Sequence, residues 1–285
     1  MKARILLIPL SVLALAIIVG GCTPSPQPAG VAEGKMQIVV SILPQAYFVE
    51  RLGGDKVEIT VMVPPGASPA TYEPTGSQMR DLAQARMYVR IRVPFEGAWM
   101  DKIAAANKDM LIVDSTEGIE RIGGKNPHIW LSPRLVKIQV ENIYAGLLQI
   151  DPANKDFYAR NKEEFLKELD ALDKELAETL AGVKGGRFMV FHPAWSYFAR
   201  DYGLEQIPVE IEGKEPSAAE LAELIETAQA NDIKVIFVQP QFSSKSAETI
   251  AKQIGGQVMF VDPLARDWAN NLRVVAKTFA QGLSE

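Results

Sequence analysis

The sequence predicts an α/β protein of two lobes, each with a four-stranded, mostly parallel sheet flanked by helices, joined by one long rigid α-helix. Short apolar runs rich in β-branched residues alternate with helical patterns, which is typical of parallel sheets covered on both faces. This alternation occurs twice along the 285 residues. Between the two series, residues 154–183 contain no Gly or Pro before Gly182, as expected of a single long helix.

The first series predicts an N-terminal lobe over residues 36–150. The strands are expected at 37–42, 57–63, 87–93 and 110–114, and the helices at 45–52, 77–85, 97–106 and 133–148. Because a helix follows each strand, the carboxyl ends of the strands should lie at one edge of the sheet, where open α/β sheets bind their ligands.

Residues 151–184 are expected to connect the lobes. Their apolar residues recur at i, i+4, i+7 and i+11 and form one stripe, which consists of Phe165, Leu169, Leu172 and Leu176. The stripe could pack within its own chain or against a second copy in a coiled-coil dimer. Its short length favours a helix within one chain, which would allow only modest rotation of one lobe on the other.

The second series predicts a C-terminal lobe of the same design over residues 185–285. Its strands are expected at 188–191, 206–211, 235–238 and 257–261, and its helices at 194–202, 217–230, 246–254 and 267–281. Ser217, three residues before Glu220, indicates a capping box at a helix start. Gly255 and Gly256 indicate a helix end.

Composition excludes several classes of function. A net charge of −5 without a basic stripe argues against a nucleic-acid partner. A single Cys excludes an intrachain disulfide and Cys-cluster metal sites. The only histidines, His128 and His192, exclude a site of three protein imidazoles. Glu210, Glu212 and Glu215 form an acidic segment that is expected to be a solvated loop, with a place beside the cleft as the alternative.

The N-terminus is expected to be a targeting segment. Lys2 and Arg4 precede an apolar run over residues 5–19 that is about as long as a signal-peptide core. The run ends shortly before Cys22, and this pattern resembles a bacterial lipoprotein signal that is cleaved after residue 21 and acylated on the Cys22 thiol. A plain secretory signal with an incidental Cys is the alternative. Residues 22–35 are rich in Pro and Gly and should form a flexible tether outside the cytoplasm.

Three candidate metal ligands lie just after predicted strands. His128 follows the fourth strand, His192 ends the fifth, and Asp262 follows the last. Two imidazoles and a carboxylate suit a divalent first-row ion such as Zn²⁺ or Mn²⁺. Alternatively, each of these residues makes only local hydrogen bonds in its loop.

Several motifs resemble those of zinc/manganese-type (cluster A-I, TroA-like) substrate-binding lipoproteins of ABC importers, over nearly the whole chain after the signal. They are PATYEP at 69–74, PHIWLSP at 127–133, FHPA at 191–194, EGKEPS at 212–217, QPQFSS at 239–244 and DPL at 262–264. The resemblance implies two Rossmann-like lobes with a metal ion between them and an ABC importer permease as partner. It also implies His128, His192 and Asp262 as metal ligands.

One ligand of the family pattern is missing. Where the family has a His, this chain has Ala70, and a methyl group cannot coordinate a metal. Water or Glu73 could occupy the open position. Alternatively, Arg92 could fill the space, so that the cleft takes an anionic ligand or a metal chelate. A third possibility is that the altered site has no transport ligand.

The resulting hypothesis is an extracytoplasmic, lipid-anchored monomer that delivers Zn²⁺, Mn²⁺ or possibly Fe²⁺ to an ABC importer without covalent chemistry. Two His and one carboxylate are also the ligand set of non-haem iron oxygenases, and a metallohydrolase would keep a similar open site. The sequence shows no general base or cosubstrate site beside the three residues. A metal-dependent enzyme is therefore the weaker alternative.

Overall fold

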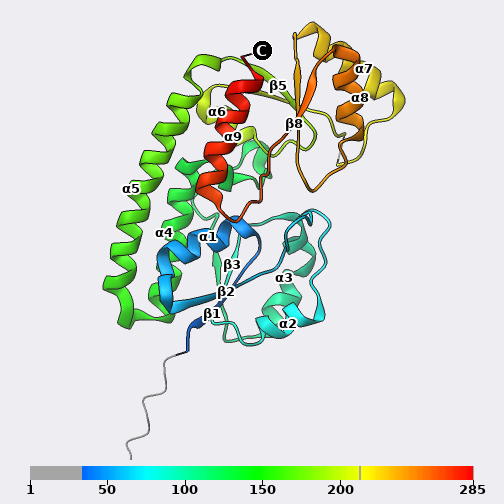
Figure 1. Cartoon of the computed structure of the whole chain (residues 1–285). Coiled ribbons are helices and arrows are strands. Elements are labelled where there is room, and N and C mark those ends of the chain that lie inside the picture. The colour runs from blue at the N-terminus through cyan, green and yellow to red at the C-terminus, as the bar shows by residue number, and fades with distance from the viewer. Residues whose placement is uncertain (1–33, 212, 285) are drawn as a thin grey trace, which may run out of the picture. The chain divides into compact units, whose positions relative to one another are not determined.

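The computed structural model describes residues 34–211 and 213–284, and from Lys35 onward the chain forms one compact unit (Figure 1). The expected signal segment, tether and Cys22 lie outside the described residues. None of the helices in the described part is both long and apolar enough to span a membrane.

The N-terminal half holds a sheet of four parallel strands in the order β2-β1-β3-β4. The strands are β1 (Met36–Val40), β2 (Val57–Val61), β3 (Met87–Arg90) and β4 (Leu111–Asp114), and the helices are α1 (Leu43–Gly53), α2 (Gly76–Leu82), α3 (Pro94–Ala106) and α4 (Pro133–Ile150). All four strands and all four helices expected in this half are present.

The C-terminal half repeats this arrangement with the strand order β6-β5-β7-β8, again all parallel. The strands are β5 (Arg187–Val190), β6 (Glu205–Pro208), β7 (Val235–Val238) and β8 (Gln257–Phe260), and the helices are α6 (Ser196–Tyr202), α7 (Ala218–Ala230), α8 (Lys245–Ile254) and α9 (Trp268–Gly282). The expected capping box at Ser217 starts α7, and Gly255 in the left-handed conformation ends α8. The predicted fold class is therefore confirmed.

Most expected strands are longer than the observed ones at their carboxyl ends. The strand expected through residue 93 ends at Arg90, because the chain then turns under the buried Glu96. The Glu96 carboxylate accepts the backbone N–H groups of Ile91 (2.9 Å) and Arg92 (2.8 Å). Arg92 has a φ of 58°, in the left-handed region that non-glycine residues rarely adopt. The loop after β3 is thus held by a buried carboxylate rather than by the sheet.

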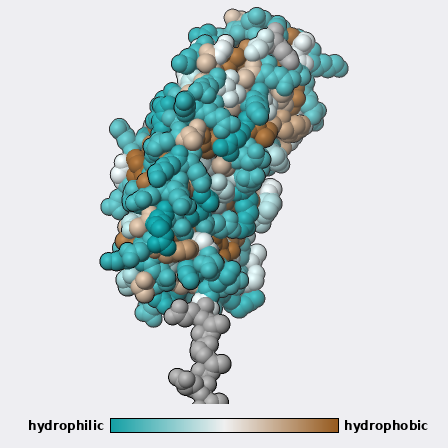
Figure 2. All heavy atoms as spheres, turned by 60° about the vertical axis from the view of Figure 1, so that its left-hand side comes forward, coloured by the Kyte–Doolittle hydropathy of each residue, from teal (hydrophilic) through white to brown (hydrophobic). Residues whose placement is uncertain are grey.

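The long helix is α5 (Lys155–Thr179). Its predicted apolar stripe is buried within the chain, and α5 packs against α1, α4 and α9. In Figure 1, α4 and α5 lie side by side next to the N-terminal sheet, and α5 continues upward beside α9. Figure 2 shows that the face presented on this side is mostly hydrophilic. Since the stripe is already covered, it is not available for the coiled-coil alternative.

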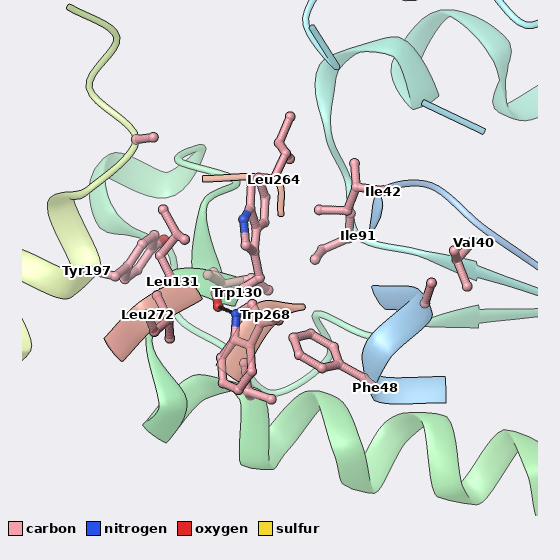
Figure 3. Packing of buried hydrophobic residues seen from close by; sticks show 14 of the residues in the cluster. Val40, Ile42, Phe48, Ile91, Trp130, Leu131, Tyr197, Leu264, Trp268 and Leu272 are labelled. Carbon is pink, nitrogen blue, oxygen red and sulfur yellow. Dashed lines mark hydrogen bonds between the residues drawn. The ribbon is translucent and has the colours of Figure 1, made fainter. Parts of the chain in front are cut away.

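A shared hydrophobic core joins the two halves. One cluster of buried residues runs from the N-terminal sheet through α5 to α6 and α9, while a smaller cluster lies between the C-terminal sheet and α7 and α8. At the junction, Trp268 donates its Nε1–H to the carbonyl of Trp130 (2.7 Å), and Trp130 donates its own to the carbonyl of Pro263 (2.6 Å) (Figure 3). The ring of Phe48 packs edge-on against Trp268, with centroids 5.1 Å apart. Buried contacts of this kind resist large rotation between the lobes.

Candidate metal-binding site

His128 lies in the loop between β4 and α4, and Asn126 sets the orientation of its ring. The Oδ1 atom of Asn126 accepts the backbone N–H of His128 at 3.1 Å and lies 2.8 Å from Nδ1 of the ring. A backbone N–H can only donate, so the facing atom of Asn126 is its carbonyl oxygen. Nδ1 of His128 must therefore carry the hydrogen, which leaves a lone pair on Nε2 of the neutral ring.

His192 follows β5, and a buried carboxylate orients it. Its Nδ1 lies 2.9 Å from Oε1 of Glu210, a residue that is only 9% exposed. Gln239 holds the backbone of His192 from both sides, accepting its N–H (3.1 Å) and donating to its carbonyl. Phe242 stacks on the ring, with centroids 4.9 Å apart. When Nδ1–H donates to Glu210, the neutral ring again has a lone pair on Nε2.

The two Nε2 atoms face each other at 3.1 Å, with the ring centroids 5.1 Å apart. Two lone pairs at this distance repel each other unless a cation lies between them. Burial, and then the neighbouring His192 ring, lowers the pKa of His128 well below its ordinary value, which disfavours a proton in that place. Two nitrogens bound to a tetrahedral Zn²⁺ at about 2.0–2.1 Å would lie about 3.3 Å apart. The histidine pair therefore fits a zinc ion after a shift of a few tenths of an ångström.

A largely apolar cavity of about 170 Å³ opens beside the pair. Ala70 lies on its wall, so the position that the family pattern gives to a third His is empty of side-chain donors. The other lining residues are Ser68, Pro69, Val93, Pro94, Pro127, His128, Trp130, His192, Gln241, Phe242, Pro263 and Leu264.

The structure does not bring Asp262 to the histidines. Its Oδ1 accepts hydrogen bonds from Nε2 of Gln241 (2.9 Å) and from the backbone N–H of Leu264 (2.9 Å). Asp262 lines a neighbouring cavity, and Gln241 lies on the walls of both. Within residues 34–211 and 213–284, no three His, Cys, Asp or Glu side chains are grouped closely enough to hold a metal. In this structure the expected three-ligand set is reduced to the two histidines.

Two other candidates from the sequence lie away from the cavity. Arg92 is 55% exposed and pairs with Asp114, with Nη2 2.6 Å from Oδ2, so its guanidinium does not fill the space beside Ala70. Glu73 is exposed and does not line the cavity. The interpretation that Arg92 converts the cleft into an anion site is therefore not supported, because Asp114 already neutralises its charge.

The sequence alone assigns no role to Asn126 and favours a solvated loop for Glu210 over a place beside the cleft. The structure buries Glu210 against His192, in agreement with the second of these two possibilities. The parallel register explains this contact. β5 and β6 pair Val190 with Pro208, and the pairing continues as Glu210 donates its backbone N–H to the carbonyl of Phe191 (3.0 Å). The contact between Glu210 and His192 therefore follows from the pairing of β5 with β6, which the sequence alone does not specify.

Comparisons with known proteins find similarity to zinc-uptake proteins. A family model described as "Zinc-uptake complex component A periplasmic" matches residues 38–282. The high-affinity zinc uptake system protein ZnuA of Bacillus subtilis (strain 168) is 29% identical over 256 residues, which cover 81% of this chain and 79% of that protein.

A second relative and a solved structure extend the likeness. The zinc-binding lipoprotein AdcA of Streptococcus pneumoniae serotype 4 is 31% identical over 82% of this chain, which spans about half (51%) of AdcA. A crystal structure of a ZnuA deletion mutant with zinc bound is 48% identical, with a TM-score of 0.82 over 87% of this chain and 98% of that one. The likeness thus covers both lobes and the helix between them.

Proposed function

The chain belongs to the family of zinc-uptake complex component A, and on that premise we propose that it captures Zn²⁺ between its lobes and delivers it to an ABC importer. The observation that carries the proposal is the pair of facing Nε2 atoms of His128 and His192 at 3.1 Å. Relatives named as zinc uptake and zinc-binding proteins support zinc as the cargo.

The two histidines act as the protein's ligands, and their partners prepare them. Asn126 and Glu210 hold the hydrogens on Nδ1 and so leave each Nε2 free for the ion. Glu210 also offsets part of the charge of a buried dication. Asp262 could become a ligand only by leaving Gln241 and the N–H of Leu264. We therefore assign it a positioning role on Gln241.

Capture should involve little domain movement. The two tryptophan hydrogen bonds and the shared core hold the lobes together, so closure about α5 is expected to be small. The importer would then recognise both lobes at once. No step of this cycle requires a covalent reaction, and the names of the two relatives describe zinc uptake and zinc binding.

A calorimetric titration tests the proposal. The purified full chain, stripped of metal by a chelator, should bind one Zn²⁺ per molecule in a non-coordinating buffer. Mn²⁺ should bind more weakly, because the affinity of nitrogen ligands for divalent metals follows the Irving–Williams order, in which Mn²⁺ ranks far below Zn²⁺. If no saturable binding of either ion is observed, the proposed function is wrong.

We also infer that Cys22 anchors the protein to a membrane outside the cytoplasm. The lipoprotein-like sequence before Cys22 and the name of the relative AdcA support this anchor. The substitution Cys22→Ser should move the protein from the membrane fraction to the soluble extracytoplasmic fraction. A variant that stays with the membranes would contradict the anchor.

A further inference from the structure

We propose that Zn²⁺ binds here together with a small nitrogen heterocycle of the imidazole type, which occupies the cavity beside Ala70 and supplies a third metal ligand. This inference rests on the proposed function, since it concerns how the captured zinc ion is coordinated. Three features of the cavity carry it: the number of protein donors, the nature of the walls, and one buried acceptor without a partner.

The protein offers too few donors for a closed zinc site. Zinc in proteins is almost always four-coordinate, and sites that hold it firmly have three or four protein ligands. In the described part of the chain only His128 and His192 converge, and no third His, Cys, Asp or Glu joins them. Ala70 lies at the wall where a third donor would project. At least one further coordination position of the zinc ion must therefore be filled by a ligand from outside the protein.

The cavity walls favour an organic ring over water alone. Proline, valine, leucine and aromatic side chains form most of the lining of the cavity. A buried water needs two to four polar partners to be stable, and the mainly apolar walls supply few of them. A flat ring can coordinate the metal through one edge and place its carbon edges against these walls. Water would satisfy the metal but would leave the apolar walls poorly filled.

Gln241 adds a requirement for a hydrogen-bond donor. Its Nε2 donates to the carboxylate of Asp262, which fixes the orientation of the amide, and its Oε1 is buried without a hydrogen-bond partner. A buried acceptor that no donor satisfies is unfavourable, because the atom has lost its bonds to water without replacement. Oε1 itself is enclosed, but because Gln241 lines the cavity, a small turn of its side chain would present Oε1 to a ligand there, and that ligand can satisfy it if it carries an N–H. Imidazole has a metal-binding nitrogen on one side and an N–H on the other, whereas a carboxylate has no donor.

Imidazole itself is the probe for the main experiment. Zn²⁺ is titrated into the metal-free full chain in a non-coordinating buffer, alone, with excess imidazole, or with excess acetate. Free imidazole competes for zinc, so it weakens the apparent affinity of any protein that forms no ternary complex. We expect the opposite here, a gain of about tenfold or more with imidazole and none with acetate. Native mass spectrometry should show protein, zinc and imidazole in a 1:1:1 complex.

Two substitutions at the same position provide matched controls. Ala70→Leu fills the cavity without adding a donor, so zinc should still bind through the histidine pair but imidazole should no longer strengthen binding. Ala70→His adds the third imidazole within the chain, so zinc should bind tightly alone and imidazole should only compete. Gln241→Leu should lose most of the imidazole gain. Thermal unfolding of each variant confirms that it is folded.

The possible outcomes separate the two proposals. If zinc binds to the wild-type chain but imidazole weakens binding, the ternary complex is wrong and the proposed function stands. If acetate rather than imidazole strengthens binding, the heterocycle is wrong because the extra ligand is anionic. If Ala70→Leu keeps the full imidazole gain, imidazole binds elsewhere and the cavity assignment is wrong. If no zinc binds under any condition, the proposed function itself fails.

Discussion

The two lobes share one strand order, yet they hold their histidines in different ways. In the N-terminal lobe the neutral amide of Asn126 orients His128 within its own loop. In the C-terminal lobe the buried carboxylate of Glu210 orients His192 across neighbouring strands. A carboxylate fixes the ring and also offsets metal charge, whereas an amide only fixes the ring. The comparison predicts that His192 contributes more to zinc affinity than His128 does.

Removing either ring should have the largest effect. His192→Ala and His128→Ala each leave a single protein ligand, so we expect zinc affinity to fall by more than about 100-fold, beyond the 10- to 100-fold typical of groups that only orient a ligand. Calorimetry on both variants measures the loss. If His192→Ala costs more than His128→Ala, the proposed difference between the lobes is supported, and equal losses or the reverse order would contradict it.

The orienting groups should give the next largest effect and the sharpest comparison. Glu210→Gln keeps the shape of the side chain but removes its charge, and we expect zinc affinity to fall by about 10- to 100-fold. Asn126→Ala should cost less, at the lower end of that range, because no charge is lost. The two variants are measured side by side by zinc competition with a fluorescent chelator. An equal cost for both would mean that the charge of Glu210 is unimportant.

The pH dependence of the free energy of unfolding should show the protonation of His128. Burial, and then the His192 ring, lowers the pKa of His128 in the folded chain well below its unfolded value of about 6.5. Between these two values the unfolded chain binds more protons, so the free energy of unfolding falls as the pH decreases below about 6.5. The contribution of one such group is at most about 1.4 kcal/mol per pH unit.

Urea unfolding of the metal-free protein at several pH values between about 7 and about 5 measures this slope, because that range spans the ordinary titration of histidine. The variant His128→Asn should show a shallower decrease than the wild type. If both chains lose stability in parallel, His128 is not the group that titrates. The neutral form of His128 is also the form that ligates zinc. Because its lowered pKa keeps the ring neutral, His128 should remain able to bind zinc in mildly acidic solution.

Arg92→Ala should have the smallest effect. The exposed pair with Asp114 contributes about 0–1 kcal/mol to stability, and its side chain does not reach the cavity. We expect zinc affinity to stay within about twofold of the wild type, since twofold corresponds to well under 1 kcal/mol. A large change in either direction would restore the interpretation in which Arg92 takes part in binding. The same calorimetric titration decides it.

The sequence predicted the elements well because both halves repeat apolar strands followed by amphipathic helices. Each expected strand and helix is present, and the differences lie at the carboxyl ends of strands. The strand expected through residue 93 is an example. Alternating hydrophobicity does not reveal that the buried carboxylate of Glu96 captures the backbone N–H groups of Ile91 and Arg92 and so ends the strand.

By itself, the sequence determined the fold class, the place of both histidines in loops that follow strands, and the absence of a third histidine at Ala70. Only the tertiary structure decided which acidic residue accompanies the histidines. The parallel register of β5 and β6 sets Glu210 beside His192, while Gln241 and the N–H of Leu264 hold Asp262 elsewhere. Periodicity specifies which face of a strand a residue occupies. The direction of a loop carboxylate depends instead on strand register and on the hydrogen-bond donors that meet it, which become neighbours only in the folded chain.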